Sequence, residues 1–366
     1  MKVWIESAFD NLPHEGFRKQ RYWLMAEAFA AAGHETTYFT CDFNHGTKSR
    51  RVFSAQVESA VKLVTIPVLP YAKNVSLKRV ISHRVYARDL AKKMRTMAKP
   101  DLIVVATPPL SSSIVALDYA RETGAKFAVD IQDAWPETFY RLLPSALKWL
   151  GKLAFAPMHT QAKRLYAEAD AVTGVAERYR VLSRRDDYRL FRHGIEPTSP
   201  VASPSAAPHR LVYLGNLGEG YDLRTVIDAV NADERLTLDI AGKGPRETEL
   251  RKFASARIRF HGYLGATAAR DLLSKCEVGV IPMRDDSWVG LPYKLGDYLA
   301  AGLRVVSSLH GECGELIERE GVGATYDFGS PDSLRRALGR LRAGASHLPD
   351  ELRADLIYPA YVRAIV

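Results

Sequence analysis

Short apolar runs alternate with segments of helical periodicity along almost the whole chain. In the first half the apolar runs lie at 3–5, 36–40, 61–68, 101–106, 126–131 and 171–175. In the second half they lie at 211–214, 236–241, 257–261, 278–282 and 304–307. Continuous apolar runs are typical of strands buried on both faces, and parallel strands need long, usually helical, connections. The sequence therefore predicts an α/β protein built from doubly wound parallel sheets.

The alternation is interrupted at residues 197–208, which contain four prolines and few bulky side chains. This composition is typical of a linker, and a length of 366 residues suits two domains. We expect a first Rossmann-like domain over 1–196, a linker over 197–208 and a second such domain over 209–349. The segment from about 350 to 366 is expected to pack back on the first domain. Because such sheets bind ligands at the carboxyl ends of their strands, we expect the two domains to face each other across a cleft.

The excess of positive over negative charge is confined to the first half of the chain. The net charge is +9, and residues 1–200 hold 30 Lys and Arg against 20 Asp and Glu, whereas the remainder holds 21 against 22. This asymmetry favours an anionic partner for the first domain, with a solvated basic face as the alternative. The three cysteines form no C-x-x-C pair, and no leader-like or membrane-spanning apolar stretch occurs, so a cytoplasmic location is predicted.

Two glycine turns follow predicted strands of the second domain. The first is Gly215-Asn216-Leu217-Gly218-Glu219-Gly220, and the second is Gly242-Lys243-Gly244. Glycines at the end of a strand let the backbone approach a diphosphate and donate N–H groups to it, and Lys243 could add charge. A tight turn without a ligand would have the same sequence.

The segment 290–302 predicts a helix that begins near Pro292 and ends at Gly302. Lys294 and Asp297 project from its first turns. A lysine can neutralise phosphate, and a carboxylate can accept two hydrogen bonds from a ribose diol. In isolation, these two residues would equally form an ordinary surface ion pair.

In the first domain, residues 130–137 close a strand with three acidic side chains and a tryptophan. Polar groups at the carboxyl end of a strand often serve a site, so the candidate catalytic residues are Asp133 and Glu137. Capping of a helix by Asp133 is the alternative. Candidate acceptor contacts at the same edge are His45, Lys48 and Trp135. Gly16, which is expected to open the first helix nearby, is a candidate donor contact. No metal-binding motif or Asp-x-Asp occurs, so neither a metal nor a cofactor is expected.

Together these segments resemble the family 4 glycosyltransferases, in the branch that builds bacterial O-antigen, capsule and exopolysaccharide units. The resemblance spans nearly the whole chain and includes Gly33-His34-Glu35, Pro100-Asp101-Leu102-Ile103, 130–137, 213–218, 241–245, Phe260-His261-Gly262-Tyr263 and 292–302. It implies a GT-B fold and a retaining, metal-independent transfer from a nucleotide sugar, expected to be a UDP-sugar. In the front-face mechanism attached to this family, the leaving phosphate itself takes the proton of the acceptor.

The resemblance also implies roles for residues of the donor site. The diphosphate would lie on the loop 215–220, Tyr263 would border the base, and Asp297 falls on the second carboxylate of the family's E-x7-E motif, which binds ribose. The first glutamate of that motif falls on Val289, for which Asp286 is the candidate substitute. Asn216 stands where the family has an arginine, and Tyr221 lies near the position of its lysine, so Lys294, Lys243 or Arg224 has to supply charge.

The expected acceptor is a saccharide, lipid-linked or soluble, and no nucleic-acid partner is expected. The basic stretch 71–99 and the segment 142–155, which is rich in Leu and Trp, predict docking of the first domain on the inner face of the cytoplasmic membrane. The alternative is that 142–155 packs on the sheet. Two other functions remain open: a non-catalytic scaffold that binds nucleotide sugars or glycolipids, and a GT-B sugar-nucleotide epimerase.

Overall fold

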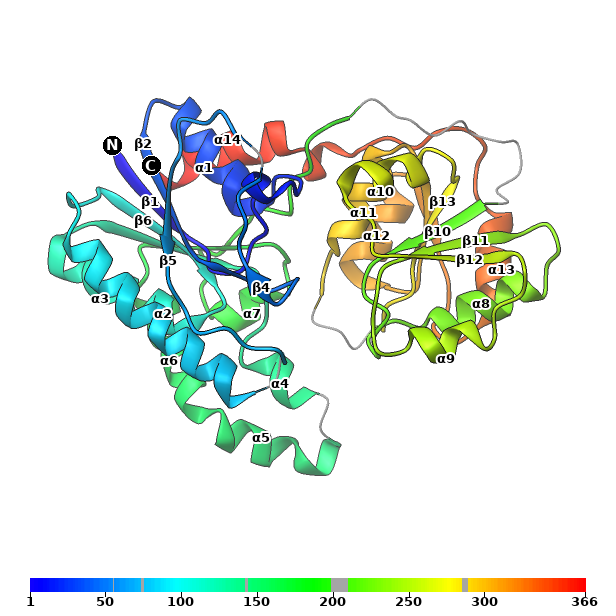
Figure 1. The fold of residues 1–366 in the computed structure, drawn as a ribbon, viewed down its shortest axis with the longest axis horizontal. Coiled ribbons are helices and arrows are strands. Elements are labelled where there is room, and N and C mark those ends of the chain that lie inside the picture. The colour runs from blue at the N-terminus through cyan, green and yellow to red at the C-terminus, as the bar shows by residue number, and fades with distance from the viewer. Residues whose placement is uncertain (55, 74–75, 142–143, 199–209, 285–288) are drawn as a thin grey trace. The chain divides into compact units, whose positions relative to one another are not determined.

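The computed structural model describes residues 1–54, 56–73, 76–141, 144–198, 210–284 and 289–366 (Figure 1). Its contacts divide the chain into two compact units. Unit 1 comprises Met1–Arg192 and Leu356–Val366, and unit 2 comprises His193–Asp355. The chain therefore returns to unit 1 through its C-terminal helix.

Unit 1 is built on a seven-stranded sheet in the order β5-β2-β1-β6-β7-β8-β9, and all of its pairings are parallel. The strands are β1 Lys2–Glu6, β2 Glu35–Cys41, β5 Lys62–Ile66, β6 Leu102–Thr107, β7 Lys126–Ile131, β8 Ala171–Gly174 and β9 Arg189–Leu190. A short antiparallel hairpin, β3 Phe43–Asn44 with β4 Ser49–Arg50, follows β2.

Helices cover both faces of this sheet. They are α1 Arg21–Ala31, α2 Leu77–Arg95, α3 Leu110–Thr123, α4 Glu137–Arg141, α5 Lys148–Ala154, α6 Ala156–Glu168, α7 Tyr179–Ser183 and α14 Ala354–Ile365, with 3-10 turns η1 Pro13–Glu15 and η2 Ser145–Leu147. In Figure 1, α2, α3 and α6 lie on one side of the sheet, and α1 and α14 lie on the other. Tyr361 of α14 packs edge-on against Phe29 of α1 and Phe191, which anchors the C-terminal helix in the core.

Unit 2 has a six-stranded parallel sheet in the order β12-β11-β10-β13-β14-β15. Its elements are β10 Arg210–Leu214, α8 Leu223–Asn231, β11 Thr237–Ala241, α9 Glu247–Arg251, β12 Ile258–Gly262, α10 Ala266–Leu273, β13 Val278–Ile281, α11 Tyr293–Ala300, β14 Arg304–Ser307, α12 Gly311–Arg319, β15 Gly323–Thr325, α13 Pro331–Gly339 and η3 Asp350–Leu352. One apolar cluster joins the sheet to α8, α9 and α13, and a second joins it to α10, α11 and α12, so the sheet is covered on both faces (Figure 1).

The two doubly wound parallel sheets predicted from the sequence are confirmed. Several short elements have no sequence signal, namely the β3–β4 hairpin, β9 and β15. Each is two or three residues long, so periodicity has too few positions in which to appear.

Candidate active site

In unit 2 the strand order reverses at β10, which lies between β11 and β13. Crevices at such switch points, beyond the carboxyl ends of the strands, are where doubly wound sheets bind ligands. The loop 215–220 leaves β10 at this point, and α11 follows β13 in the chain. The predicted diphosphate site is therefore at the switch point of the unit 2 sheet.

The two glycine loops pack against each other through their backbones. The N–H of Gly215 donates to the carbonyl of Ala241 (2.9 Å), and the N–H of Leu217 donates to that of Lys243 (3.1 Å). Gly242 has φ of +142°, and a Cβ there would stand 1.8 Å from the carbonyl oxygen of Gly215. Only glycine fits this contact, because a side chain would have to displace backbone.

Lys294 lies directly against the first glycine of the loop. A Cβ on Gly215, whose φ is +148°, would stand 2.6 Å from Lys294 Nζ. The ammonium also lies over two rings, 4.3 Å from the centroid of Tyr221 and 4.9 Å from that of Tyr213. Burial lowers the pKa of Lys294 to about 8, while the charge of Asp297, one turn further along α11, acts to raise that pKa. A half-buried cation beside an open glycine loop is suited to an anionic ligand.

Three tyrosines without a role in the predicted site shape the surroundings of this lysine and of the first glycine loop. Tyr298 packs against Gly279 of β13, and its hydroxyl accepts a hydrogen bond from the N–H of Leu214 (2.9 Å). The hydroxyl of Tyr213 donates to the carbonyl of Asn216 (2.6 Å). Tyr221, near the position where the family has its lysine, supplies one of the two rings under Lys294. Tyr298, one turn after Lys294 on the predicted helix, was the only one with a sequence signal.

The other predicted donor residues are spread around this edge. Asp297 is half-buried on α11, whereas Lys243, Tyr263 and Asn216 are exposed on the loops that follow β11, β12 and β10. Gly218 and Gly220 continue the first loop, and no atom lies within 4 Å of a Cβ placed on Gly220. Asp286 lies outside the described residues. Val289 packs against an apolar cluster of unit 2, so the chain has a hydrophobic contact at the first position of the E-x7-E motif.

In unit 1, Asp133 follows β7 and is oriented by local hydrogen bonds. Its Oδ1 accepts from the N–H of Ala134 (2.8 Å) and from the hydroxyl of Thr138 (3.3 Å), and burial raises its pKa. Glu137, at the start of α4, lies 3.5 Å from Nδ1 of His159 on α6. The role of both carboxylates in catalysis stays a prediction.

Asp130, in the same segment, is structural. It is fully buried, and its carboxylate accepts two hydrogen bonds from the Arg21 guanidinium (2.7 and 2.8 Å). The hydroxyls of Tyr22 (2.7 Å) and Thr173 (2.6 Å) complete its shell. This pair ties α1 to β7, and removal of one partner would cost about 3–5 kcal/mol.

The structure brings the predicted acceptor residues together at the carboxyl edge of the unit 1 sheet. Nδ1 of His45 lies 2.6 Å from the hydroxyl of Tyr71 and 3.3 Å from Nζ of Lys48, and Trp135 is 8% exposed. Gly16, with φ of +78°, ends η1 instead of opening a helix, because α1 begins only at Arg21. Its contribution to donor binding stays a prediction.

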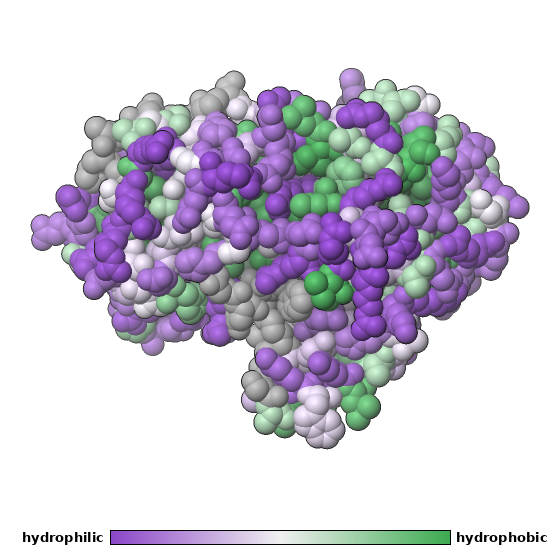
Figure 2. Space-filling model, turned by 180° about the vertical axis from the view of Figure 1, so that it is seen from behind, coloured by the Kyte–Doolittle hydropathy of each residue, from purple (hydrophilic) through white to green (hydrophobic). Residues whose placement is uncertain are grey.

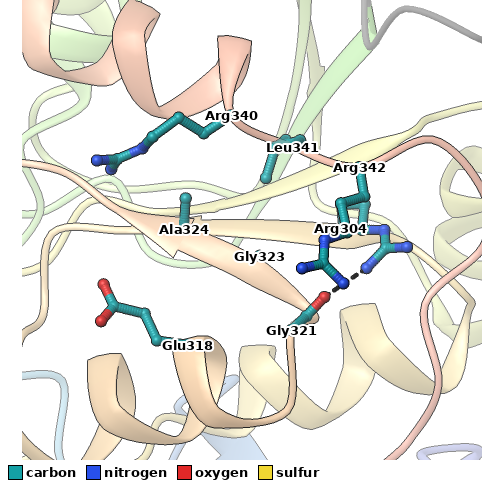
Figure 3. A pocket seen from close by; sticks show the side chains of 8 residues that line it. All are labelled: Arg304, Glu318, Gly321, Gly323, Ala324, Arg340, Leu341 and Arg342. Atoms are coloured by element: carbon teal, nitrogen blue, oxygen red, sulfur yellow. Dashed lines mark hydrogen bonds between the residues drawn. The ribbon is translucent and has the colours of Figure 1, made fainter.

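A pocket of about 380 Å³ in unit 2, separate from the glycine loops, is shown in Figure 3. Its lining residues are Arg304, Glu318, Gly321, Gly323, Ala324, Arg340, Leu341 and Arg342. Arg304 and Gly323 are the first residues of β14 and β15, so the pocket lies at the opposite edge of the sheet from the glycine loops. The Arg304 guanidinium donates to the carbonyls of Gly321 (2.6 Å) and Gly344 (3.1 Å), which indicates a structural role.

Two models of known families match this chain. "Glycosyl transferase 4-like domain" matches residues 20–190, and "Glycosyl transferases group 1" matches residues 208–343. The chain belongs to the family 4 glycosyltransferases. The resemblance seen in the sequence is thereby confirmed.

A curated relative of this glycosyltransferase is the putative colanic acid biosynthesis glycosyltransferase WcaL of Escherichia coli (strain K12). The two chains are 25% identical over an alignment of 189 positions, and the match covers 47% of this chain and 45% of WcaL. The match thus spans less than half the length of that relative.

Solved structures show the same fold at low sequence identity. Sucrose-phosphate synthase from Thermosynechococcus elongatus aligns with a TM-score of 0.66 at 14% identity, over 100% of this chain and 94% of that one. Anabaena HepE in complex with UDP and glucose aligns with a TM-score of 0.61 at 13% identity, over 100% and 95%. AviGT4, a glycosyltransferase involved in avilamycin A biosynthesis, aligns with a TM-score of 0.57 at 15% identity, over 100% and 93%. The predicted GT-B fold is confirmed.

Proposed function

We propose that this glycosyltransferase transfers a sugar from a UDP-sugar to a saccharide acceptor, with retention of anomeric configuration and without a metal ion. The observation that carries the proposal is the half-buried Lys294 against the glycine loop at the switch point of unit 2. The complex of HepE with UDP and glucose, and the match to WcaL, favour a UDP-linked donor and a role in polysaccharide synthesis.

In this proposal the glycine loop and Lys294 act on the leaving diphosphate. N–H groups of the loop and the Lys294 ammonium stabilise the negative charge that develops as the bond to the sugar breaks. The leaving phosphate takes the proton of the acceptor hydroxyl, so no carboxylate of the enzyme has to act as nucleophile. Asp133, whose pKa is raised by burial, serves to orient the reacting groups.

The test is turnover. A panel of nucleotide sugars is first screened for thermal stabilisation, because ligands that bind the native state raise its apparent stability. Those that stabilise are then incubated with saccharide acceptors in EDTA, and released UDP and the anomeric configuration of the product are measured. Binding without turnover of any nucleotide sugar would favour the non-catalytic scaffold, and an inverted product would contradict retention.

We further propose that unit 1 docks on an anionic membrane surface and takes a lipid-linked acceptor. Helix α5 does not pack on the sheet, since Gly151 is its only buried residue. The exposed apolar side chains of α5 are Trp149 (61%), Leu150 (44%) and Leu153 (67%), and Leu147 (44%) precedes them at the end of η2. Lys148 and Lys152 of α5 accompany them. In Figure 2, the projecting part of unit 1 that carries α4 and α5 shows hydrophobic residues interspersed with hydrophilic ones.

A second apolar patch supports this proposal. Leu77, Val80 and Ile81 are exposed at the start of α2, beside the exposed Lys78 and Arg84. A surface that combines apolar and basic side chains is suited to anionic headgroups, at roughly 1 kcal/mol for each Lys or Arg near the membrane. Among the residues that the structure describes, no helix is long and apolar enough to cross a membrane.

Vesicle sedimentation tests the docking. We expect the protein to sediment with anionic but not neutral vesicles at low salt, and to be released as salt is raised. Leu153→Glu should weaken sedimentation, whereas Val181→Glu on α7, where Val181 is 75% exposed, serves as the matched control. Equal partitioning to both vesicle types, or to neither, would favour a soluble acceptor.

A further inference from the structure

A cluster of aromatic and cationic side chains lies at the carboxyl edge of the unit 1 sheet. We call it the Arg79 cage, and its members are Phe9, Lys48, Tyr71, Arg79, His83 and Trp135. They come from the loop after β1, the turn between β3 and β4, the loop before α2, helix α2 itself and the segment after β7. Five separate segments thus converge on one place.

Two aromatic rings hold Arg79 at the centre of the cage. Its guanidinium carbon lies 5.0 Å from the ring centroid of Trp135 and 5.5 Å from that of Phe9. Its Nε donates to Nε2 of His83 (3.4 Å), whose ring stacks on Trp135. A guanidinium fixed in this way keeps its planar donors in one orientation, which suits an oxyanion better than a mobile surface arginine would.

Lys48 provides a second positive charge in the cage. Its φ of +59° is a backbone conformation uncommon for a lysine, and its Nζ donates to the carbonyl of His45 (2.5 Å) and lies 5.3 Å from the ring centroid of Tyr71. Among the residues that the structure describes, Lys48 makes no salt bridge. Burial, together with the charge of Arg79, lowers the pKa of Lys48 to about 8.

The other titratable groups that act on the cage are His45, His83, Tyr71 and Asp133. Burial, together with the charge of Arg79, lowers the pKa of both His45 and His83 to about 3, so both imidazoles are neutral and can bond to hydroxyls. Asp133 is the carboxylate whose charge acts on Arg79, and burial raises its pKa. Two cations are thus held together against their repulsion beside the predicted catalytic carboxylate, and an anionic ligand would relieve that repulsion.

We propose that the Arg79 cage binds an oxyanion of the acceptor, next to the sugar that is extended. Arg79 and Lys48 are then specificity-determining residues for the acceptor. The inference rests on the proposed glycosyl transfer. Two sources share this chemistry: the phosphate or diphosphate of a lipid-linked saccharide, and the carboxylate of a uronic acid. The rings of Trp135 and Phe9 would contact the apolar face of the sugar or the lipid stem beside the charge.

The experiment measures binding of geranyl diphosphate to the full chain by calorimetry, with UDP at saturation so that the donor site is filled. Geraniol and glucuronic acid are measured in parallel, without vesicles. We expect geranyl diphosphate to bind and geraniol not to bind. Glucuronic acid binding in place of the diphosphate would support the oxyanion and identify the carboxylate as its source.

Variants assign the binding to the cage. Arg79→Gln and Lys48→Gln should each weaken binding of the diphosphate ten-fold or more, and Lys163→Gln, which removes an exposed charge of unit 1 on α6, should leave it unchanged. Because Arg79 also packs between rings, Lys48→Gln keeps the test decisive if Arg79→Gln fails to fold. Equal affinity of the native chain and both cage variants, or no binding of any anion, would overturn the proposal. Failure to bind UDP in the first step would instead count against the proposed transferase function.

Discussion

Replacement of Lys294 by methionine tests whether this lysine binds the diphosphate or only stabilises the fold. The ammonium lies on two tyrosine rings and against Gly215, and burial holds its pKa near 8. If its role is to neutralise a diphosphate, the variant should lose affinity for UDP yet keep its fold. Methionine retains the length and apolar stem of the side chain, so it removes little besides the charge.

The expected loss of affinity follows from the kind of contact that is removed. A hydrogen bond to a charged group contributes about 1.5–3 kcal/mol. At about 1.4 kcal/mol for each factor of ten, the dissociation constant of UDP should rise roughly 10- to 100-fold. The exposed Lys275 of unit 2 supplies the control, since Lys275→Met changes net charge equally and should leave UDP affinity as it was.

The same substitution should increase the stability of the ligand-free protein, although it weakens the binding of UDP. The pKa of Lys294 falls from 10.5 in the unfolded chain to about 8 in the folded one, so between these pH values the unfolded state binds more protons. Stability conferred through this group is therefore lowest below pH 8 and rises with pH between 8 and 10.5. At pH 7, Lys294→Met should raise the free energy of unfolding, by an amount on the order of 1 kcal/mol after solvent screening.

Calorimetric titration with UDP at pH 7 and pH 9, together with urea unfolding at pH 7, tests both parts. In the native chain, affinity should fall about 10-fold between pH 7 and pH 9, because UDP must then bind a site that has lost its proton. In Lys294→Met this dependence should disappear. Unchanged UDP affinity combined with reduced stability would show that Lys294 only packs against its tyrosines, and would refute the assignment.

Three further predictions concern the candidate site. Asp297→Asn should raise the dissociation constant of UDP about ten-fold, or about 1.4 kcal/mol, and unchanged affinity in calorimetry would remove Asp297 from the ribose site. Gly242→Ala should abolish UDP binding because its Cβ would stand 1.8 Å from the carbonyl oxygen of Gly215, whereas Gly339→Ala at the end of α13, with no atom within 4 Å of its Cβ, should bind UDP normally; equal behaviour of the two in a thermal-shift assay would contradict the packing of the loops. Asp133→Asn should lower kcat at least ten-fold with UDP affinity unchanged, and a native rate of UDP release would exclude Asp133 from catalysis.

The fold could be predicted from the sequence because its signals are local. Each long strand is an apolar run of three to eight residues, and each helix repeats its apolar face within two turns. The glycine loops and the helix that carries Lys294 and Asp297 could be predicted for the same reason. Those motifs lie within contiguous segments, so their order alone indicated a GT-B glycosyltransferase.

The environment of each charged group was decided by the tertiary structure alone. From the sequence alone, Lys294 could equally be one partner of a surface ion pair. It is a half-buried cation only because Tyr213 and Tyr221, more than 70 residues earlier in the chain, lie beneath it. Arg79 is one of several basic residues of α2, and only the approach of Phe9 and Trp135 separates it from its neighbours. Burial and charge proximity act through space between segments that are distant along the chain, and so the proton affinity of a side chain is fixed only when the sheet brings those segments to a common edge.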